Sequence, residues 1–340
     1  MARIVGIKDV AQHAGVSVGT VSNVINRPDL VAPETRVRVQ ATIDQLGYVR
    51  SEAARSLRAG QSRIIGQLVL DMANPFFADV ASGASRAARA AGLRVMLCNS
   101  ANDPEEEAEY LSLFAEQRVR GVLLTPADPT GADLAVLRRH EIPFVLVDRV
   151  TSDGCSVSVD DVAGGRMAAA HLAGTGHELV GYVSGPMSLA QCRDRRTGAL
   201  AALTAHGLPE DALIHVEAER MDVASGRDAG RRLLKLSRGP TAVFCANDLL
   251  ALGVLQSLYA AGVSVPAEMA IVGYDDIELA SAAAVPLTSV RQPSAEMGQI
   301  AAELLIEETG TEPVRQRHRH RRVVLEPELV VRESTRADGA

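Results

Sequence analysis

The chain has 340 residues, too many for one ordinary hydrophobic core, and this length predicts two or three folded units. Hydrophobic residues make up 47% of it, which excludes a largely disordered protein. The net charge of −7 would by itself argue against nucleic-acid binding, but residues 1 to 65 carry nine Lys or Arg against five Asp or Glu. This N-terminal part therefore has a charge of +4 and the remainder −11, a division that suits phosphate contact at one end of the chain only.

The N-terminus has no apolar signal core, and no apolar stretch reaches the length that spans a membrane. We therefore expect a cytoplasmic protein without membrane contact. The four cysteines are scattered without a Cys-x-x-Cys pair. We interpret them as reduced core residues, not as disulfide or metal ligands: Cys98, Cys155, Cys192 and Cys245.

Residues 7 to 26 predict two short helices joined by a tight corner at Gly15. The first helix carries an apolar stripe with i, i+3, i+4 and i+7 spacing: Ile7, Val10, Ala11 and Ala14. Ser17 suits the N-cap of the second helix, which turns Val21, Val24 and Ile25 inward and Val18, Gly19, Ser22 and Asn23 outward. A third amphipathic helix is expected around residues 33 to 46. Such a unit fits a DNA groove, although a plain helical hairpin inside a larger all-helical unit is the alternative.

These residues resemble the lactose-repressor family of bacterial transcription regulators, and the resemblance runs from Ile7 to about Ser334. The matching motifs include Ile7-Lys8-Asp9-Val10-Ala11, Ala14-Gly15-Val16-Ser17, Thr20-Val21-Ser22, Val24-Ile25-Asn26, Thr35-Arg36, Leu46-Gly47-Tyr48 and Ala54-Arg55-Ser56-Leu57. We expect residues 1–50 to form a helix-turn-helix DNA-binding domain. Its expected DNA contacts are Ser17, Val18, Gly19, Thr20, Ser22, Asn23, Asn26 and Thr35.

Residues 51–62 are expected to form a hinge helix and linker. The resemblance implies that this segment folds when two copies meet on DNA, with Leu57 wedged into the minor groove. Packing of Leu57 on its own linker is the alternative. The family usually enters this helix through a Pro-Asn pair, whereas this chain has Arg50-Ser51, so the effect on hinge folding is open.

Residues 63–340 predict a two-lobed α/β effector-binding and dimerisation domain, because apolar runs of strand length alternate with helical patterns. The expected strands are 64–70, 94–98, 121–125 and 144–147 in one lobe, and 179–183, 242–245, 270–273 and 323–325 after it. Ligands of such sheets bind beyond the carboxyl ends of the strands. The resemblance to periplasmic sugar-binding proteins implies a type I periplasmic-binding-protein-like core with a cleft between its lobes.

Polar residues gather just after the predicted strands, among them Asp71, Thr125 and Asp248, and we expect Thr125 to contact the effector. The family resemblance implies effector contacts from Asp148, Asn247, Asp275 and Arg195, the last within an Arg-x-x-Gly pattern. Carboxylates and amides accept hydroxyl hydrogens and Arg donates in a fork, a set that suits a sugar. Helix N-capping is the alternative for Asp248 and Asp276. The chain has no Trp, so Phe77 is our aromatic candidate, with burial in the core as its alternative.

The run from Arg317 to Arg322 contains His318 and His320 in alternation with arginines. We interpret it as a solvated loop before the last strand. Two histidines without a nearby Cys or carboxylate would make an incomplete metal shell, so we expect no metal site and no cofactor.

The sequence thus predicts a homodimeric transcriptional regulator, with repression favoured, that binds a near-palindromic operator under control of a small effector. The expected effector is a sugar or sugar derivative, and a purine, an acid or a phosphorylated sugar stays open. A dimer is expected because no heptad repeat follows Thr335. The alternative is a solute-binding protein for sugar uptake, which would need a secretory signal and no DNA module. An enzyme is not expected, since no phosphate-binding or nucleophile motif is complete. Effector identity, the sign of regulation, the operator and the regulated genes stay open.

Overall fold

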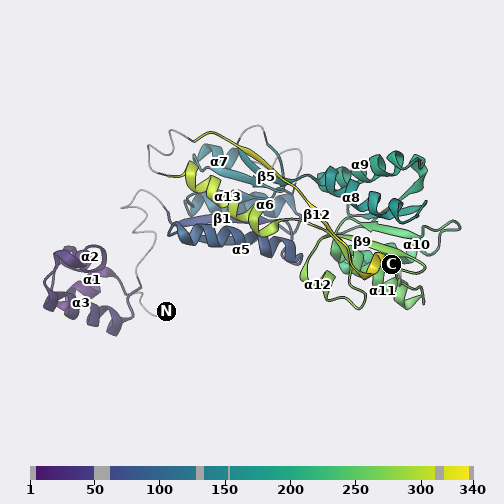
Figure 1. Ribbon diagram of the computed structural model, residues 1–340. Coiled ribbons are helices and arrows are strands. Elements are labelled where there is room, and N and C mark those ends of the chain that lie inside the picture. Colours follow the sequence, from purple (N-terminus) through teal and green to yellow (C-terminus); the bar gives the residue numbers. More distant parts are fainter. Residues whose placement is uncertain (1–4, 50–61, 128–133, 152–153, 311–317, 337–340) are drawn as a thin grey trace. The chain divides into compact units, whose positions relative to one another are not determined.

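The computed structural model describes residues 5–49, 62–127, 134–151, 154–310 and 318–336. The chain divides into two compact units, Met1–Ser62 and Arg63–Ala340, each of which is described separately. Figure 1 shows a small helical unit and a larger unit with two α/β lobes. In the part of the chain that the structure describes, we find no helix with the length and hydrophobicity of a membrane span.

The small unit contains the helices α1 (Ile7–Ala14), α2 (Val18–Asn26) and α3 (Pro33–Leu46), with a short 3-10 turn at Pro28–Leu30. Gly15 ends α1 at φ 64°, a left-handed conformation that glycine adopts without a steric penalty. The apolar stripes of the three helices meet in one core made of Val10, Ala11, Ala14, Val21, Val24 and Val39. The predicted corner and all three predicted helices are therefore confirmed.

The first lobe of the larger unit contains a six-stranded parallel sheet with the order β11-β5-β4-β3-β1-β2. Its strands are β1 (Ile64–Val69), β2 (Arg94–Asn99), β3 (Val122–Leu124), β4 (Phe144–Val147), β5 (Cys155–Val159) and β11 (Arg322–Leu325). Helices α5 (Pro75–Ala90) and α13 (Ser294–Glu308) share a core on one face of this sheet. Helices α6 (Pro104–Glu116) and α7 (Ala135–Arg139) share the core of the other face.

The second lobe contains a sheet with the order β12-β10-β9-β8-β6-β7, in which only β12 runs antiparallel to its neighbour. Its strands are β6 (Val180–Ser184), β7 (Leu213–Glu217), β8 (Ala242–Cys245), β9 (Ala270–Asp275), β10 (Thr288–Arg291) and β12 (Glu328–Val330). Its helices are α8 (Asp161–Gly174), α9 (Ala190–Ala205), α10 (Val223–Leu233), α11 (Asp248–Ala260) and α12 (Glu278–Ser281). One continuous apolar core fills this lobe.

The chain passes between the lobes after β5, after β10 and after β11. Helix α13 and strand β11 therefore complete the first lobe although they follow the second lobe in sequence. All eight predicted strands are present, with ends shifted by at most two residues. The prediction missed the strands β5, β7, β10 and β12. It also assigned the strand at 323–325 to the second series, whereas this strand, β11, pairs with β5 in the sheet of the first lobe.

Glycines let helices approach closely where two of them cover the same sheet face. A side chain at Gly298 of α13 would overlap the carbonyl oxygen of Val80 on α5, and one at Gly83 would overlap that of Ala295. The pairs α8 with α9 and α10 with α11 meet in the same way at Gly198 and Gly253. These close contacts hold the paired helices in place beside the sheets whose strand ends carry the cleft residues.

Candidate functional site

The second helix of the small unit is fixed at its start by Ser17. The hydroxyl of Ser17 accepts a hydrogen bond from the backbone N–H of Thr20 at 3.0 Å, and the two side-chain oxygens lie 2.9 Å apart. The predicted N-cap is therefore confirmed. At the other end of α2, the amide of Asn26 donates to the carbonyl oxygen of Ser22 at 2.7 Å.

The face of α2 that we expect to meet base edges is open to solvent. Val18 retains 36% of its accessible surface, and Gly19 and Asn23 are exposed as well. Val21 and Val24 on the opposite face are buried, whereas Ile25 is only partly buried. Thr20, Ser22 and Thr35 are partly buried near this surface. Leu57 and the predicted hinge lie outside the described residues.

A cavity of about 440 Å³ lies between the two lobes of the larger unit. Residues of both lobes line it: Leu70, Asp71, Asn74, Phe76, Phe77, Ala101, Asn102, Pro104, Ala127, Asp148, Pro186, Ser188, Leu189, Gln191, Arg195, Glu219, Arg220, Met221, Asp222, Asn247, Asp275 and Gln292. Five of the six predicted effector residues are among them. Thr125 is not: it is 1% exposed, and its N–H continues the strand pairing by donating to the carbonyl oxygen of Leu68 at 3.0 Å.

Arg195 is held rigidly at the cavity wall. Its Nε donates to Asp161 Oδ1 at 2.8 Å, and Nη1 donates to the carbonyl oxygen of Ala246. The guanidinium also stacks on the ring of Tyr274, with 3.6 Å between its carbon and the ring centroid. Tyr274 in turn donates its hydroxyl proton to Asp161. A guanidinium fixed by an ion pair and an aromatic ring keeps its remaining donors pointing in set directions.

Two buried carboxylates in left-handed backbone conformations face the cavity. Asp148 follows β4 at φ 59°, and Asp275 ends β9 at φ 102°. Residues other than glycine rarely adopt this backbone conformation, and those that do cluster at functional sites. Burial, opposed by the nearby Arg149, raises the pKa of Asp148 to about 7. Burial likewise raises the pKa of Asp275 to about 6, against the lowering effect of Arg195.

The two carboxylates differ in how their oxygens are bonded. Asp275 accepts from Asn74 Nδ2 at 2.9 Å and from Gln292 Nε2 at 2.7 Å. By contrast, Asp148 Oδ1 is buried without a hydrogen-bond partner among the described residues. A buried polar atom of this kind costs free energy unless a bound molecule or water satisfies it.

At least two hydrogen bonds join the lobes across the cavity. Asn74, which precedes α5 in the first lobe, reaches Asp275 in the second. Arg149, which follows β4, donates from Nη2 to Gln191 Oε1 of α9 at 2.6 Å. Asp148, Arg195, Asn247 and Asp275 are all at most 7% exposed, so they lie on the inner wall of the cavity, whereas Asn102 and Glu219 are exposed at its rim.

The helix-capping alternative fails for Asp248, because its neighbour Asn247 is the N-cap of α11. Asn247 caps α11 by accepting from the N–H of Leu250 at 2.9 Å, while its amide donates to the carbonyl oxygen of Met221 at 3.0 Å. Asp248 is not the cap: it accepts from Ser289 Oγ and from the backbone N–H of Ile277. Asp276 forms ion pairs with two arginines, Arg291 at the end of β10 and Arg332 just after β12.

Phe77 is 6% exposed in the first-lobe core and also lines the cavity, so its role as an aromatic contact stays a prediction. Its neighbour Phe76 lines the cavity too, with 5.0 Å between the two ring centroids. The sequence interpretation also missed the acidic turn Glu219 to Asp222, which follows the missed strand β7. A short apolar run at 213–216 followed by acidic residues was the available signal.

The assumption of an incomplete metal shell around His318 and His320 is wrong. Cys155 and Glu308, distant in sequence, lie beside both histidines. The description of the cysteines as core residues holds for Cys155, Cys192 and Cys245, which are buried, whereas Cys98 is partly exposed on the edge strand β2.

Comparison with known proteins identifies the two units. Residues 6–51 match "Bacterial regulatory proteins, lacI family", and residues 169–335 match "Periplasmic binding protein-like domain". The chain is 35% identical over 334 residues to the HTH-type transcriptional repressor PurR of Photobacterium profundum, an alignment that covers 97% of this chain and 98% of that protein. The chain belongs to the lacI family. It is a DNA-binding transcriptional regulator with an effector-binding domain.

Further relatives agree with this assignment. The ribose operon repressor of Escherichia coli (strain K12) is 36% identical over 316 residues, 92% of this chain and 95% of that protein. A solved structure of the lac repressor dimer bound to operator and the anti-inducer ONPF superposes with a TM-score of 0.84 at 27% identity, over 98% of this chain and all of that one. A complex of the transcriptional regulator CelR with cellobiose superposes at 0.72 with 32% identity, over 97% of this chain and 99% of that one. PurR and the ribose operon repressor both carry the name of a repressor.

Proposed function

We propose that this lacI-family regulator is a homodimeric repressor that binds a near-palindromic operator and releases or holds it according to a neutral, sugar-like effector in the cleft. The observation that carries the effector class is Asp148 Oδ1, a buried acceptor without a partner among the described residues, set in the wall of the cavity. A hydroxyl group supplies the hydrogen that this oxygen lacks.

The charges around the cavity favour a neutral polyol over an anion. Five carboxylates line it against two guanidinium groups, and Arg195 is already paired with Asp161. An acid or a phosphorylated sugar would face like charges from several sides. Phe76 and Phe77 offer apolar ring surface for the carbon face of a sugar. The cellobiose complex of CelR supports this class of effector.

A direct test of the effector site compares Asp148→Asn with the wild type. We expect a sugar found by a thermal-shift screen to raise the melting temperature of the wild type. Because the amide replaces one acceptor oxygen with a donor, a buried polar group is left without its partner, and affinity should fall by roughly tenfold to a hundredfold, equal to about 1.4–3 kcal/mol. Asp79→Asn, on the exposed side of α5, is the matched control and should leave the affinity unchanged. Equal affinity in all three proteins would reject the role of Asp148.

In the DNA-binding unit we propose that Ser17, Thr20, Ser22, Asn26 and Thr35 contact phosphates or set the position of α2. Val18, Gly19 and Asn23 then meet base edges in the major groove, with Asn23 suited to adenine and Val18 to a thymine methyl group. The exposure of all three supports this assignment. Leu57 in the hinge is proposed as the minor-groove wedge. Chromosomal DNA as the partner places this activity in the cytoplasm.

Asn23→Ala tests the readout by α2. Asn23 is exposed, so the fold should tolerate the change, and preference at one operator position should weaken by about 1–3 kcal/mol. Selection from a randomised operator pool measures this preference. Gln45→Ala, an exposed change on α3, serves as the control. An Asn23→Ala protein that selects the same operator as the wild type would refute the assignment.

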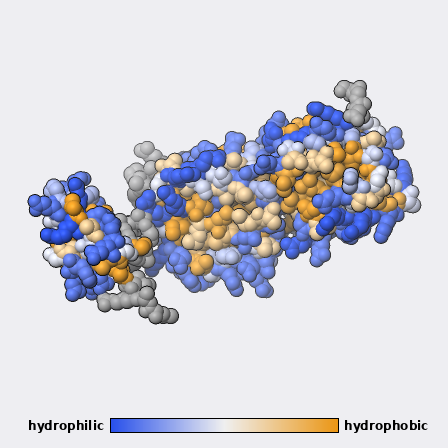
Figure 2. All heavy atoms as spheres, turned by 90° about the horizontal axis from the view of Figure 1, so that it is seen from below, coloured by the Kyte–Doolittle hydropathy of each residue, from blue (hydrophilic) through white to orange (hydrophobic). Residues whose placement is uncertain are grey.

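A second copy of the chain is the proposed partner of the larger unit. Figure 2 shows hydrophobic residues gathered over a broad part of one face of this unit. Met72, Leu97 on edge strand β2 and Leu113 on α6 are large apolar side chains that the first lobe leaves exposed. The dimeric lac repressor structure supports pairing of this kind. Light scattering should give the mass of two chains.

A further inference from the structure

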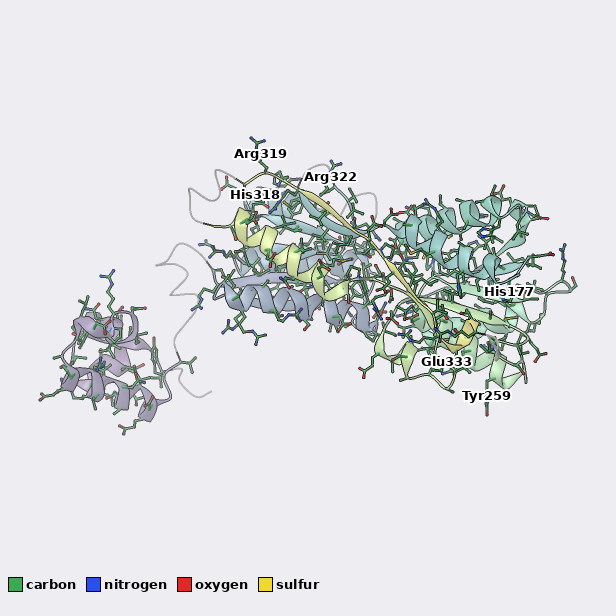
Figure 3. The ribbon with its side chains drawn as sticks, in the orientation of Figure 1. His177, Tyr259, His318, Arg319, Arg322 and Glu333 are labelled. Atoms are coloured by element: carbon green, nitrogen blue, oxygen red, sulfur yellow. The ribbon has the colours of Figure 1, made fainter. Side chains whose placement is uncertain are left out.

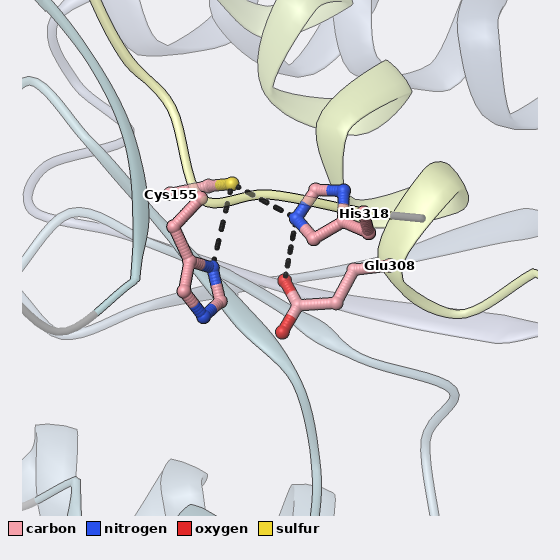
Figure 4. Close-up of side chains that lie close together, drawn as sticks. Cys155, Glu308 and His318 are labelled. Atoms are coloured by element: carbon pink, nitrogen blue, oxygen red, sulfur yellow. Dashed lines mark hydrogen bonds and ion pairs between the residues drawn. The ribbon is translucent and has the colours of Figure 1, made fainter. Parts of the chain in front are cut away.

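Four side chains that commonly bind metal ions converge in the first lobe, away from the effector cavity. They are Cys155, Glu308, His318 and His320, and their ligand atoms all lie within 4.8 Å of one another. Figure 4 shows Cys155 and Glu308 both approaching the same ring nitrogen of His318. The Sγ of Cys155 lies 3.3 Å from His318 Nε2 and 3.8 Å from His320 Nδ1. Glu308 Oε2 lies 3.8 Å from His318 Nε2.

Three separate segments of the chain bring these groups together. Cys155 is the first residue of β5, Glu308 is the last residue of α13, and the histidines precede β11, which pairs with β5. Cys155 is fully buried, and the side chain of His318 is 5% exposed. Figure 3 shows Arg319 and Arg322 pointing outward from the lobe beside His318. The His-x-His spacing thus turns both rings toward Cys155 while the arginine between them faces solvent.

The distances from Cys155 Sγ to the two imidazole nitrogens match those of a tetrahedral zinc site. Zn–S bonds of about 2.3 Å and Zn–N bonds of about 2.0–2.1 Å place S and N about 3.6 Å apart at tetrahedral angles. The two observed S to N distances, 3.3 and 3.8 Å, bracket this value. Two N or O ligands of such a site lie about 3.3 Å apart, so Glu308 Oε2, now 3.8 Å from His318 Nε2, would move closer to that nitrogen when the ion binds.

The groups around the four side chains are those that support a metal–thiolate centre. The backbone N–H of Arg321 donates to Cys155 Sγ at 3.4 Å. The second ring nitrogen of His318, Nδ1, is buried without a hydrogen-bond partner among the described residues, and Glu307 Oε2 lies 3.7 Å from it. A carboxylate behind a ligating histidine orients the ring and raises its basicity. The guanidinium of Arg321 pairs with Glu307, so its charge is offset beside the site.

We propose that Cys155, Glu308, His318 and His320 bind one zinc ion, or a divalent transition metal of the same class, in a closed tetrahedral site. A set of one thiolate, two imidazoles and one carboxylate suits zinc, and four protein ligands leave no open position, so the site is structural and not catalytic. Burial raises the pKa of the Cys155 thiol, and the metal displaces that proton on binding. The ion ties the end of α13 and the start of β11 to β5 at the sheet edge.

The experiment uses the untagged full-length protein, purified under reducing conditions without a chelator. Mass spectrometry of the metal content should find one zinc per chain. Titration of metal-free protein with Co²⁺ should produce a thiolate-to-cobalt charge-transfer band in the near ultraviolet. Zinc should also raise the melting temperature of the wild type, and a chelator should reverse the rise.

Variants separate the proposed ligands from other cysteines and histidines. Cys155→Ser should abolish the charge-transfer band, and His320→Gln, at an exposed position that tolerates change, should weaken cobalt binding by at least about tenfold. Cys98→Ser on β2, at the opposite edge of the sheet, and His140→Gln after α7 are matched controls that should bind as the wild type does. Absence of the band in the wild type, its persistence in Cys155→Ser, or unchanged cobalt affinity in His320→Gln would overturn the proposal.

Discussion

At the scale of single residues, the cleft contains two carboxyl groups, those of Asp148 and Asp275, whose burial makes them harder to ionise. Asp148 and Asp275 have raised pKa values of about 7 and about 6 because burial disfavours their charged forms. Each residue also has an unusual left-handed backbone conformation directly at a strand end. Buried carboxyl groups with raised pKa values and a strained backbone both cost stability, and their occurrence at the same two residues indicates a binding site.

The raised pKa of Asp148 predicts how stability depends on pH. Between its ordinary value of 3.8 and its folded value of about 7, the folded state holds a proton that the unfolded chain has lost. The free energy of unfolding therefore falls as pH rises through this window. Asp148→Asn removes this dependence. From pH 5 to pH 7 the larger unit should lose less stability in the variant than in the wild type, by at least about 1 kcal/mol.

Urea unfolding of the larger unit at several pH values measures this difference. Asp79→Asn, which changes an exposed carboxylate on α5, should follow the wild-type profile. Parallel profiles for wild type and Asp148→Asn would show that Asp148 does not hold a proton in the folded state at pH 5 to 6.

Residues of the site were predictable where a motif marked them. The strand-end positions and the Arg-x-x-Gly pattern led to Asp148, Asn247, Asp275 and Arg195, all of which line the cavity. Thr125 satisfied the same strand-end rule, but its position after β3 leaves it 1% exposed and off the cavity wall. Gln191 carries no strand-end or family signal, because it lies in the first turn of α9, whereas Asp222 and Gln292 follow the missed strands β7 and β10.

At the scale of helices and strands, apolar patterns located the elements that are buried on both faces. Strands β1, β3, β4 and β8 are nearly continuous hydrophobic runs, as parallel strands in the middle of a sheet are. The missed strands lack this signal. β5 alternates Ser with Val, while β7 and β12 are edge strands with polar residues. Sequence separation also concealed the pairing of β11 with β5, which depends on the chain returning to the first lobe.

Close helix packing predicts a large difference between two glycine variants. In Gly298→Ala the new methyl group would overlap the carbonyl oxygen of Val80, so α13 must shift away from α5. We expect a loss of about 1–3 kcal/mol, as in other overpacked cores. At Gly174, the last residue of α8, a methyl group would meet nothing within 4 Å. Gly174→Ala should be neutral or stabilising by up to about 1 kcal/mol.

Chemical denaturation of both variants measures these effects. Because both variants replace a helical Gly with Ala, the general effect of this replacement on helix stability cancels when the two variants are compared. If the two variants were equally stable, α5 and α13 would have enough freedom to separate, and their contact would not fix the lobe.

At the scale of the whole larger unit, the hydrogen bonds across the cleft set the balance between open and closed lobes. Gln191→Ala removes the acceptor of Arg149 and with it one link between the lobes. A hydrogen bond to a charged group contributes about 1.5–3 kcal/mol, so the open form should become roughly tenfold to a hundredfold more populated relative to the closed form. The radius of gyration from X-ray scattering of the effector-free protein should increase.

Gln117→Ala, after the exposed end of α6, is the control and should scatter as the wild type does. An unchanged radius in Gln191→Ala, together with unchanged effector affinity, would mean that the Arg149 contact does not restrain the lobes. The effector acts on DNA binding only through such a difference in affinity between two states.

The return of α13 and β11 to the first lobe has a consequence for synthesis on the ribosome. The first lobe begins at Ile64 but lacks a helix and its edge strand until the ribosome has passed Leu325. At about 5–20 residues per second, this interval lasts on the order of tens of seconds. From the synthesis of β5 to the end of that interval, β5 has no neighbour on one side and α5 lacks its contact with α13, so the nascent chain is exposed to aggregation and to chaperones. The short helical unit before it needs no later segment for its core and is free to fold first.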